Sequence, residues 1–221
     1  SYYKKNDSAM ENYTSRMVAL LGALRKAMNG AVLDTFRCYG ADYGLNYGVA
    51  IHTLRDMARG VGEDDGFARY LYQQQVRELR IIALWTASPT EIRSVESAEF
   101  WASGIINSEV AEQAAQALLC RIEPIDELLL AWTTQPNELL VYAAMLAASR
   151  SESVSVECAV AAVERVVRNF PDNHLAAQGA VALAVSLIEK NRPTVSRLLA
   201  LSDDTPTAEF LRDEVAWRLE Y

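Results

Sequence analysis

The sequence predicts an all-α protein built as a solenoid of helix pairs, and a repeated helix is the main reason. Between residues 76 and 187 one kind of helix occurs four times, with a polar start and an apolar run rich in alanine. Its equivalent positions are 32, 29 and 36 residues apart, at Ala83, Ala115, Ala144 and Ala180. These steps have the length of a two-helix repeat, and small residues let neighbouring helices pack closely. The sequence has no convincing run of alternating polar and apolar residues, so no strand is predicted.

Apolar residues at helical spacing, interrupted by glycine or proline, define the remaining helices. The first is predicted over residues 8–28 and a short one over residues 31–39. Glycines at positions 40, 44 and 48 make the next segment irregular, and helices over 52–59 and 64–74 follow. An elongated repeat array can hold the whole length, residues 1–221, as a single domain. The later breaks are predicted at Ser88-Pro89, Gly104, Glu123-Pro124, Gln135-Pro136, residues 151–155, residues 170–173, Arg192-Pro193 and Thr205-Pro206.

Prolines indicate where several of these helices begin. Five of the six prolines, all but Pro124, are followed directly by Thr, Asp or Asn. Such side chains can accept hydrogen bonds from the free amides of a helix's first turn. We therefore expect a capping residue after each of these five prolines.

The composition is typical of a soluble folded protein, with 51% apolar and 23% charged residues. No apolar stretch approaches the roughly 18 residues of a membrane-spanning helix, and the N-terminus lacks the apolar segment of a signal peptide. Cys38, Cys120 and Cys158 are odd in number and far apart, so we expect them to be reduced and buried in a cytoplasmic protein. Metal-ligand spacing, a phosphate-binding loop and a nucleophile elbow are all missing, so neither cofactor nor metal is predicted.

Charge is distributed unevenly along the chain, whose net charge is −8. Residues 1–80 contain 11 Lys and Arg against 9 Asp and Glu, whereas the remainder contains 10 against 20. Because neutralising phosphates supplies most of the affinity of DNA-binding proteins, a basic DNA-binding surface would have to lie in the first third. The acidic remainder is otherwise explained as a solvated surface that maintains solubility.

Two motifs in the first half of the chain carry a family resemblance. One is Tyr47-Gly48-Val49 followed by Leu54-Arg55-Asp56-Met57-Ala58-Arg59, and the other is Arg77-Glu78-Leu79-Arg80-Ile81-Ile82-Ala83. Together with the repeats, they resemble the AlkD-type DNA alkylation repair family over roughly residues 36–148. The resemblance implies a curved stack of HEAT-like helix pairs with damaged double-stranded DNA across the concave face. It also implies excision of alkylated purines without base flipping, by tryptophans and an aspartate.

The resemblance gives an expectation for each position of the excision site. Trp101 matches the family's tryptophan, but Ile105 stands where the aspartate is expected. The family's arginine near the lesion corresponds to Tyr142, its second site aromatic to Leu183, and the proline before its Leu-Arg pair to His52. Isoleucine cannot stabilise a positively charged sugar or orient a water molecule, so that role is unfilled. Nearby carboxylates that could substitute are Glu96, Glu99 and Glu109.

Each candidate residue also has a purely structural interpretation. Trp101 could stack on a base or sugar, or it could fill the core beside Phe100. Arg55, Arg59, Arg77 and Arg80 could form a basic DNA-binding patch, or they could pair with neighbours such as Asp56 and Glu78. Four other features are expected to be structural, with Trp85 and Trp132 as core residues and the pairs Glu96 with Glu99 and Asp126 with Glu127 as solvated surface. The loop containing Tyr39, Tyr43 and Tyr47 suits either a recognition surface or a loop packed over the first repeat.

Two functions remain open on these grounds. The missing aspartate and the acidic balance favour a binding scaffold with a degenerate glycosylase site, which recognises DNA or a protein partner along its concave face. The alternative is an active alkylpurine glycosylase with a rearranged site, which the motifs and Trp101 favour. A small-molecule hydrolase or transferase has no motif in its support.

Overall fold

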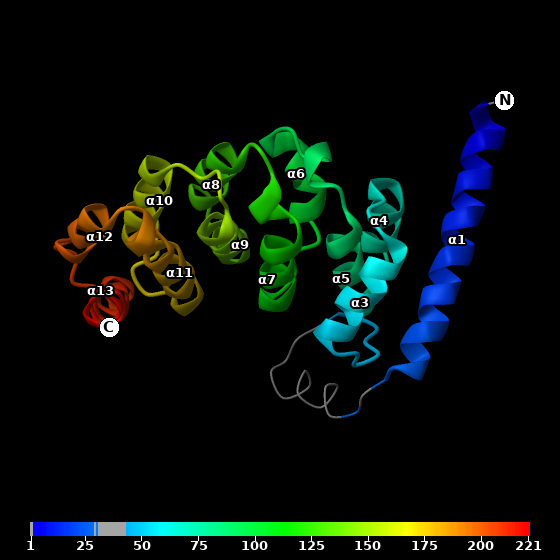
Figure 1. Cartoon of the computed structure of the whole chain (residues 1–221), viewed down its shortest axis with the longest axis horizontal. Coiled ribbons are helices and arrows are strands. Elements are labelled where there is room, and N and C mark those ends of the chain that lie inside the picture. Colours follow the sequence, from blue (N-terminus) through cyan, green and yellow to red (C-terminus); the bar gives the residue numbers. More distant parts are fainter. Residues whose placement is uncertain (1, 29, 31–42) are drawn as a thin grey trace. The chain divides into compact units, whose positions relative to one another are not determined.

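The computed structural model describes residues 2–28, 30 and 43–221, and it consists of helices (Figure 1). No strand is found in this part of the chain, where the only bridge between extended residues joins Leu45 and Val76. The all-α prediction is therefore confirmed. The helix predicted over 31–39 lies outside the described residues, as do Cys38 and Tyr39. Contacts divide the chain into an N-terminal unit, residues 1–88, and a C-terminal unit, residues 89–221. That both form a single domain stays a prediction.

The N-terminal unit contains four described helices, namely α1 (Tyr2–Lys26), α3 (Ile51–Val61), α4 (Asp65–Tyr72) and α5 (Arg77–Thr86). Helix α5 packs against both α3 and α4, and its apolar residues other than Trp85 are buried. Helix α1 contacts α4 through Tyr13, whose ring lies 5.6 Å from those of Phe67 and Tyr70. Arg16 strengthens this contact, because it bonds to Asp64 at 2.9 Å and lies over the Phe67 ring at 3.8 Å.

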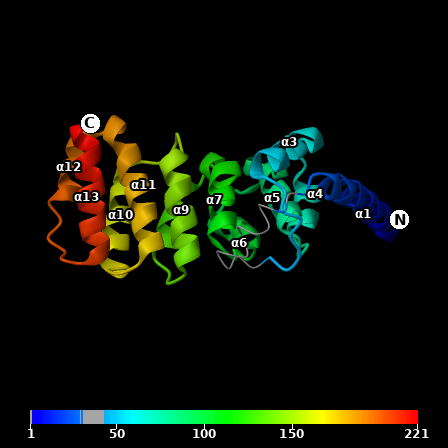
Figure 2. The same ribbon diagram turned by 90° about the horizontal axis from the view of Figure 1, so that it is seen from below.

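The C-terminal unit consists of four successive helix pairs. In each pair a first helix is followed by a second helix, and two short 3-10 helices, Pro89–Glu91 and Leu119–Arg121, lie in the connections. The second helices pack side by side, and the first helices α8, α10 and α12 form the other layer (Figures 1 and 2). The first helices are α6 (Val95–Ala102), α8 (Ile125–Thr133), α10 (Val156–Asn169) and α12 (Arg192–Leu199), and the second helices are α7 (Ser108–Ala117), α9 (Glu138–Arg150), α11 (His174–Lys190) and α13 (Pro206–Glu220).

Small residues explain why the second helices approach so closely. Ala83, Ala115, Ala144 and Ala180, the equivalent positions of the repeat, are all fully buried. In α11 the adjacent Gly179 lies against α9, where an added Cβ would sit 3.1 Å from that of Met145. The sequence prediction of a repeat built on small residues is therefore confirmed in the C-terminal unit, where three of these alanines lie on successive second helices.

Helix starts differ in part from the proline-based prediction. Asn137 and Asn173 follow a proline and cap α9 and α11 as expected. At α12 and α13 the caps are Asn191 and Thr205, which precede the proline. The reason is that proline lacks an amide hydrogen and fits the first turn itself, so the cap must come one or two residues earlier. After Pro89 the next α-helix, α6, is capped by Ser94 and not by Thr90.

Burial confirms some of the core predictions and corrects others. Trp132 is buried, whereas Trp85 is half-buried. Cys120 and Cys158 are free, as expected, but they are half-buried, because each lies on a helix face that is only partly covered. Within the described ranges, none of the helices combines the length and apolarity needed to cross a membrane.

Candidate nucleic-acid interface

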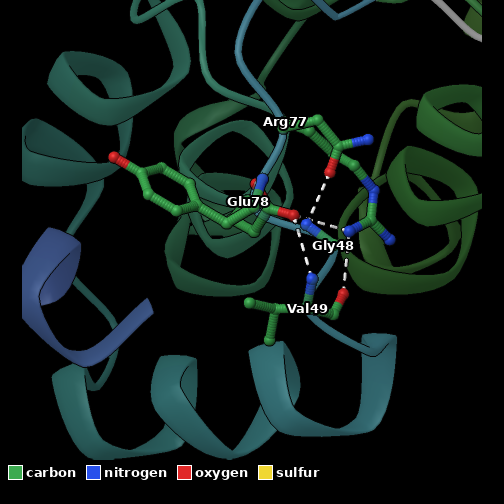
Figure 3. Close-up of polar contacts among 6 residues, drawn as sticks. Gly48, Val49, Arg77 and Glu78 are labelled. Atoms are coloured by element: carbon green, nitrogen blue, oxygen red, sulfur yellow. Dashed lines mark hydrogen bonds and ion pairs between the residues drawn. The ribbon is translucent and has the colours of Figure 1, made fainter. Parts of the chain in front are cut away.

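The two family-like motifs meet in one buried polar cluster of the N-terminal unit. Glu78 is fully buried at the start of α5, and its carboxylate accepts hydrogen bonds from the amides of Tyr47 at 2.9 Å and Val49 at 3.3 Å. Arg77, also buried, donates to the Glu78 carboxylate at 2.7 Å and to the Val49 carbonyl at 2.8 Å (Figure 3). Gly48, between these residues, has a φ of 67°, which favours glycine.

This cluster assigns a structural role to both motifs. The Arg77–Glu78 pair fixes the loop before α3 against α5, and it satisfies backbone groups that burial would otherwise leave without partners. The predicted contact of Arg77 with DNA does not fit this burial, because the guanidinium is directed into the protein. Pairing with Glu78, which was the alternative, is the arrangement in the structure.

The other three arginines remain at least partly accessible but do not form one patch. Arg55 of α3 lies over the Trp85 ring, 4.6 Å from its centroid, whereas Arg80 lies over Tyr72 of α4 at 5.5 Å. Residues 80 and 85 point about 140° apart around α5, so these two pairs lie on different sides of it. Arg59 is 76% exposed and forms an ion pair with Asp56, one turn earlier on α3.

Tyr72 itself belongs to the core beneath Arg80. Burial raises the pKa of Tyr72, and the positive charge of Arg80 lowers it by a smaller amount. The ring therefore supplies a neutral aromatic face on which the guanidinium rests.

The C-terminal unit contains the positions at which the family's excision chemistry is expected. Trp101 of α6 is fully buried, with its ring edge-on to Phe100 at 5.0 Å. Of the two interpretations of Trp101, the core residue is the one that the structure shows. Ile105 and Leu183 are buried as well. A ring without exposed area cannot stack on a base, so these three side chains serve packing.

Tyr142, at the position of the family's arginine, is engaged within the protein. Its hydroxyl donates a hydrogen bond to the Glu112 carboxylate at 2.9 Å, which links α9 to α7. Its ring lies close to Gly179 of α11. Burial, followed by the hydrogen bond and negative charge of Glu112, raises the pKa of Tyr142. Tyr142 is thus a neutral residue that joins three neighbouring second helices.

Glu112 is the polar residue that sequence reasoning missed. It lies 30 residues before Tyr142, which is one repeat length, so alignment of successive repeats would have indicated the pair. The carboxylates considered as substitutes behave differently: Glu96 and Glu99 are exposed on α6, and Glu109 is half-buried. Asp126 accepts a bond from the Ser155 amide at 2.9 Å and is part of the fold. Among the described residues, no group of three or more metal-binding side chains occurs.

The surface of the second helices in the C-terminal unit is more acidic than basic. Such a surface repels phosphates. The acidic residues of these helices are Glu109, Glu112, Glu138, Glu189, Glu209, Asp213, Glu214 and Glu220, and the basic residues are Arg150, Lys190, Arg212 and Arg218.

Comparison with known proteins agrees with the helical fold and the motifs described above. A solved structure described as a new family of proteins related to the HEAT-like repeat DNA glycosylases, with affinity for branched DNA structures, superposes with a TM-score of 0.72. It is 12% identical, and the alignment covers 91% of this chain and 93% of that one, so the likeness shows the HEAT-like helical fold. No curated protein matches the sequence. The model of the family described as DNA alkylation repair enzyme matches residues 20–154, which is more than half of the sequence, and the chain therefore belongs to the DNA alkylation repair enzyme family.

Proposed function

We propose that this protein is a DNA-binding scaffold whose excision site has lost its chemistry. The observation that carries the proposal is the filling of that site. An apolar Ile105 stands in place of the expected aspartate, and Trp101 is buried where a base-contacting tryptophan is expected. Without a carboxylate near the sugar, the cleavage of a glycosidic bond lacks its main electrostatic support.

Two observations support DNA as the ligand. The chain belongs to a DNA repair family, and a structurally similar protein is described as having affinity for branched DNA. Accessible arginines lie in the N-terminal unit, where Arg55 and Arg59 project from α3 and Arg80 from α5. Arginines bind phosphate oxygens through paired N–H groups, so Arg55 and Arg59, which both project from α3, are the proposed DNA contacts. Arg80 is not among them, because its pair with Tyr72 lies on a different side of α5 from the Arg55–Trp85 pair. Arg77, Trp101 and Tyr142 are left out because they are buried.

Fluorescence anisotropy tests DNA binding directly. The probes are a labelled linear duplex, the same duplex with an abasic-site analogue, and a four-way junction, each at about 50 mM salt and again at about 200 mM. We expect salt-sensitive binding that is tightest for the junction. Absence of binding to all three probes at low salt would show that the protein does not bind DNA.

Release of alkylpurines from methylated DNA tests the loss of chemistry. We expect no release above that of DNA incubated without protein. The second candidate function, a glycosylase with a rearranged site, is favoured by the half-buried Glu112 and its bond to Tyr142. Release that is abolished by Glu112→Gln, which keeps the shape of the side chain, would establish that function and overturn the scaffold proposal.

A further inference from the structure

We propose that a groove between α8 and α10 binds a short amphipathic segment of a protein partner, with a large aliphatic side chain flanked by lysine or arginine. The α8–α10 groove is a hollow of about 450 Å³ in the C-terminal unit. This role is separate from DNA binding, which we assign to the N-terminal unit. The lining residues are Asp126, Glu127, Leu130, Glu157, Cys158, Ala161 and Arg165.

The groove has an apolar floor with an exposed leucine. Leu130 of α8 is 54% exposed, Ala161 of α10 is exposed, and Cys158 is half-buried beside it. Covering such a side chain removes apolar surface from water, which stabilises a complex by about 25 cal/mol per Å². The volume lies within the range of roughly 300–1,000 Å³ that is usual for ligand sites. The groove is therefore suited to one large aliphatic side chain.

Carboxylates surround one end of this floor. Glu127 and Glu157 are exposed in the first turns of α8 and α10, and Asp126 lies beside them, fixed by the Ser155 amide. The helix dipole favours acidic residues in a first turn, but it does not account for an exposed leucine one turn further on. The carboxylates repel phosphates, so the combination favours a cationic, partly apolar peptide over nucleic acid.

At the other end of the groove, Arg165 restricts the occupant further. Its guanidinium donates to the Thr133 hydroxyl at 2.6 Å, which holds it toward α8. The groove therefore has a negative and a positive end, and it would orient a peptide with its lysines or arginines toward Glu127 and Glu157.

Neighbouring hollows extend the groove on both sides. A hollow of about 570 Å³ beside the start of α8 shares Asp126 and Glu127, and one of about 430 Å³ between α10 and α12 shares Glu157 and Ala161. Because they share lining residues, the three hollows adjoin one another. Arg93 and Arg121 also line the hollow beside α8, so the lysines of the peptide are expected at Glu127 and Glu157 and not beyond α8. Helix-in-groove recognition uses anchor residues at successive turns.

Anisotropy of a labelled synthetic peptide, with the full chain as the binder, tests the inference. The probe is a short helical peptide with leucines on one face and lysines beside them. One control peptide replaces the lysines by glutamate, and another replaces the leucines by serine. We expect the probe to bind at least ten times more tightly than either control. Equal binding of all three peptides, or none, would overturn the proposal.

Variants then locate the binding. Leu130→Lys and the double variant Glu127→Lys with Glu157→Lys alter exposed side chains, so they should keep the fold, and circular dichroism checks this. Each should lower the affinity for the probe peptide at least tenfold, and the double variant should gain affinity for the control peptide that carries glutamate. The matched control is Glu99→Lys, on the exposed side of α6. An equal loss in that control would show non-specific attraction and overturn the assignment.

A second copy of the chain as the occupant is tested by sedimentation. A dimer that Leu130→Lys dissociates would replace the peptide proposal, whereas a monomer in both proteins supports it. All of these variants should bind the four-way junction like the unchanged protein. If the protein binds the peptide but not DNA, only the proposed function is wrong. If it binds DNA but not the peptide, only the proposal of a peptide-binding groove is wrong.

Discussion

At the scale of single residues, Glu78 is the carboxylate whose removal should destabilise the protein most. It is fully buried, and it is bonded to two backbone amides and to Arg77. Glu78→Ala leaves the charge of Arg77 buried without its partner, which usually costs about 3–5 kcal/mol of unfolding free energy. We expect a loss of this size in urea unfolding.

The control for this prediction is Glu63→Ala, which alters an exposed carboxylate of the same unit. Surface substitutions of this kind usually change stability by no more than about 0.5 kcal/mol. A loss in Glu78→Ala no greater than in Glu63→Ala would show that the buried cluster does not hold the motifs together.

Tyr142 makes the stability of the protein sensitive to alkaline pH. Its pKa is raised in the folded state, so the folded protein keeps the hydroxyl proton more firmly than the unfolded chain. The stability that the protonated Tyr142 hydroxyl contributes is fully present below the unfolded pKa of about 10 and is lost as the pH rises through the folded pKa. In Tyr142→Phe the decline of stability above about pH 10 should therefore be shallower.

Denaturant unfolding at several alkaline pH values measures this effect. Tyr221→Phe is the matched control, because Tyr221 is 93% exposed and its substitution should leave the slope unchanged. Identical slopes in Tyr142→Phe and the unchanged protein would contradict the raised pKa of Tyr142 in the folded state.

At the scale of helices, the close approach of α9 and α11 depends on a glycine. A Cβ added at Gly179 would lie 3.1 Å from the Cβ of Met145 and 3.4 Å from the Tyr142 ring. Gly179→Ala should destabilise the protein because overpacking costs about 1–3 kcal/mol, which exceeds the gain of up to about 1 kcal/mol in helix propensity. Thermal unfolding should show a lower Tm.

The control for the helix contact is Gly60→Ala in α3, where nothing lies within 4 Å of the added atom. That variant should be as stable as the unchanged protein or slightly more stable. A Gly179→Ala protein with a raised Tm would mean that α9 and α11 can separate without cost.

Hydrogen bonds between successive repeats follow the same spacing as the alanines. Asp126 pairs with the Ser155 amide, 29 residues on, and Thr133 with Arg165, 32 residues on. The repeat was therefore predictable from the sequence, because small residues and helical spacing recur at the length of one helix pair. The caps of α12 and α13 were predicted wrongly because a proline within the first turn and a proline before the cap look alike in sequence.

At the scale of the whole molecule, the family and the fold class were predictable but the exposure of site residues was not. The motif containing Arg77 and Glu78 resembles a charged helix surface, and only the loop that packs over it makes the pair buried. Trp101 beside Phe100 is ambiguous for a similar reason, because adjacent helix residues point about 100° apart and either ring could face the core. Long-range packing decides both cases, and it leaves no local pattern.

The uneven charge of the chain leads to a prediction about how DNA binding responds to salt and to substitution. If Arg55 and Arg59 contact phosphates, the double variant Arg55→Ala with Arg59→Ala should lose at least tenfold in affinity for the four-way junction. Each phosphate contact removed should also lower the slope of log affinity against log salt by about 1, so the slope should fall by about 2. Anisotropy titrations over a range of salt concentrations measure both quantities.

Arg168→Ala is the control, because it removes an exposed charge from α10 of the acidic C-terminal unit, and it should change neither the affinity nor the slope. If Arg168→Ala reduces the slope while the double variant does not, the phosphates lie against the C-terminal unit, and the acidic surface of its second helices does not keep DNA away.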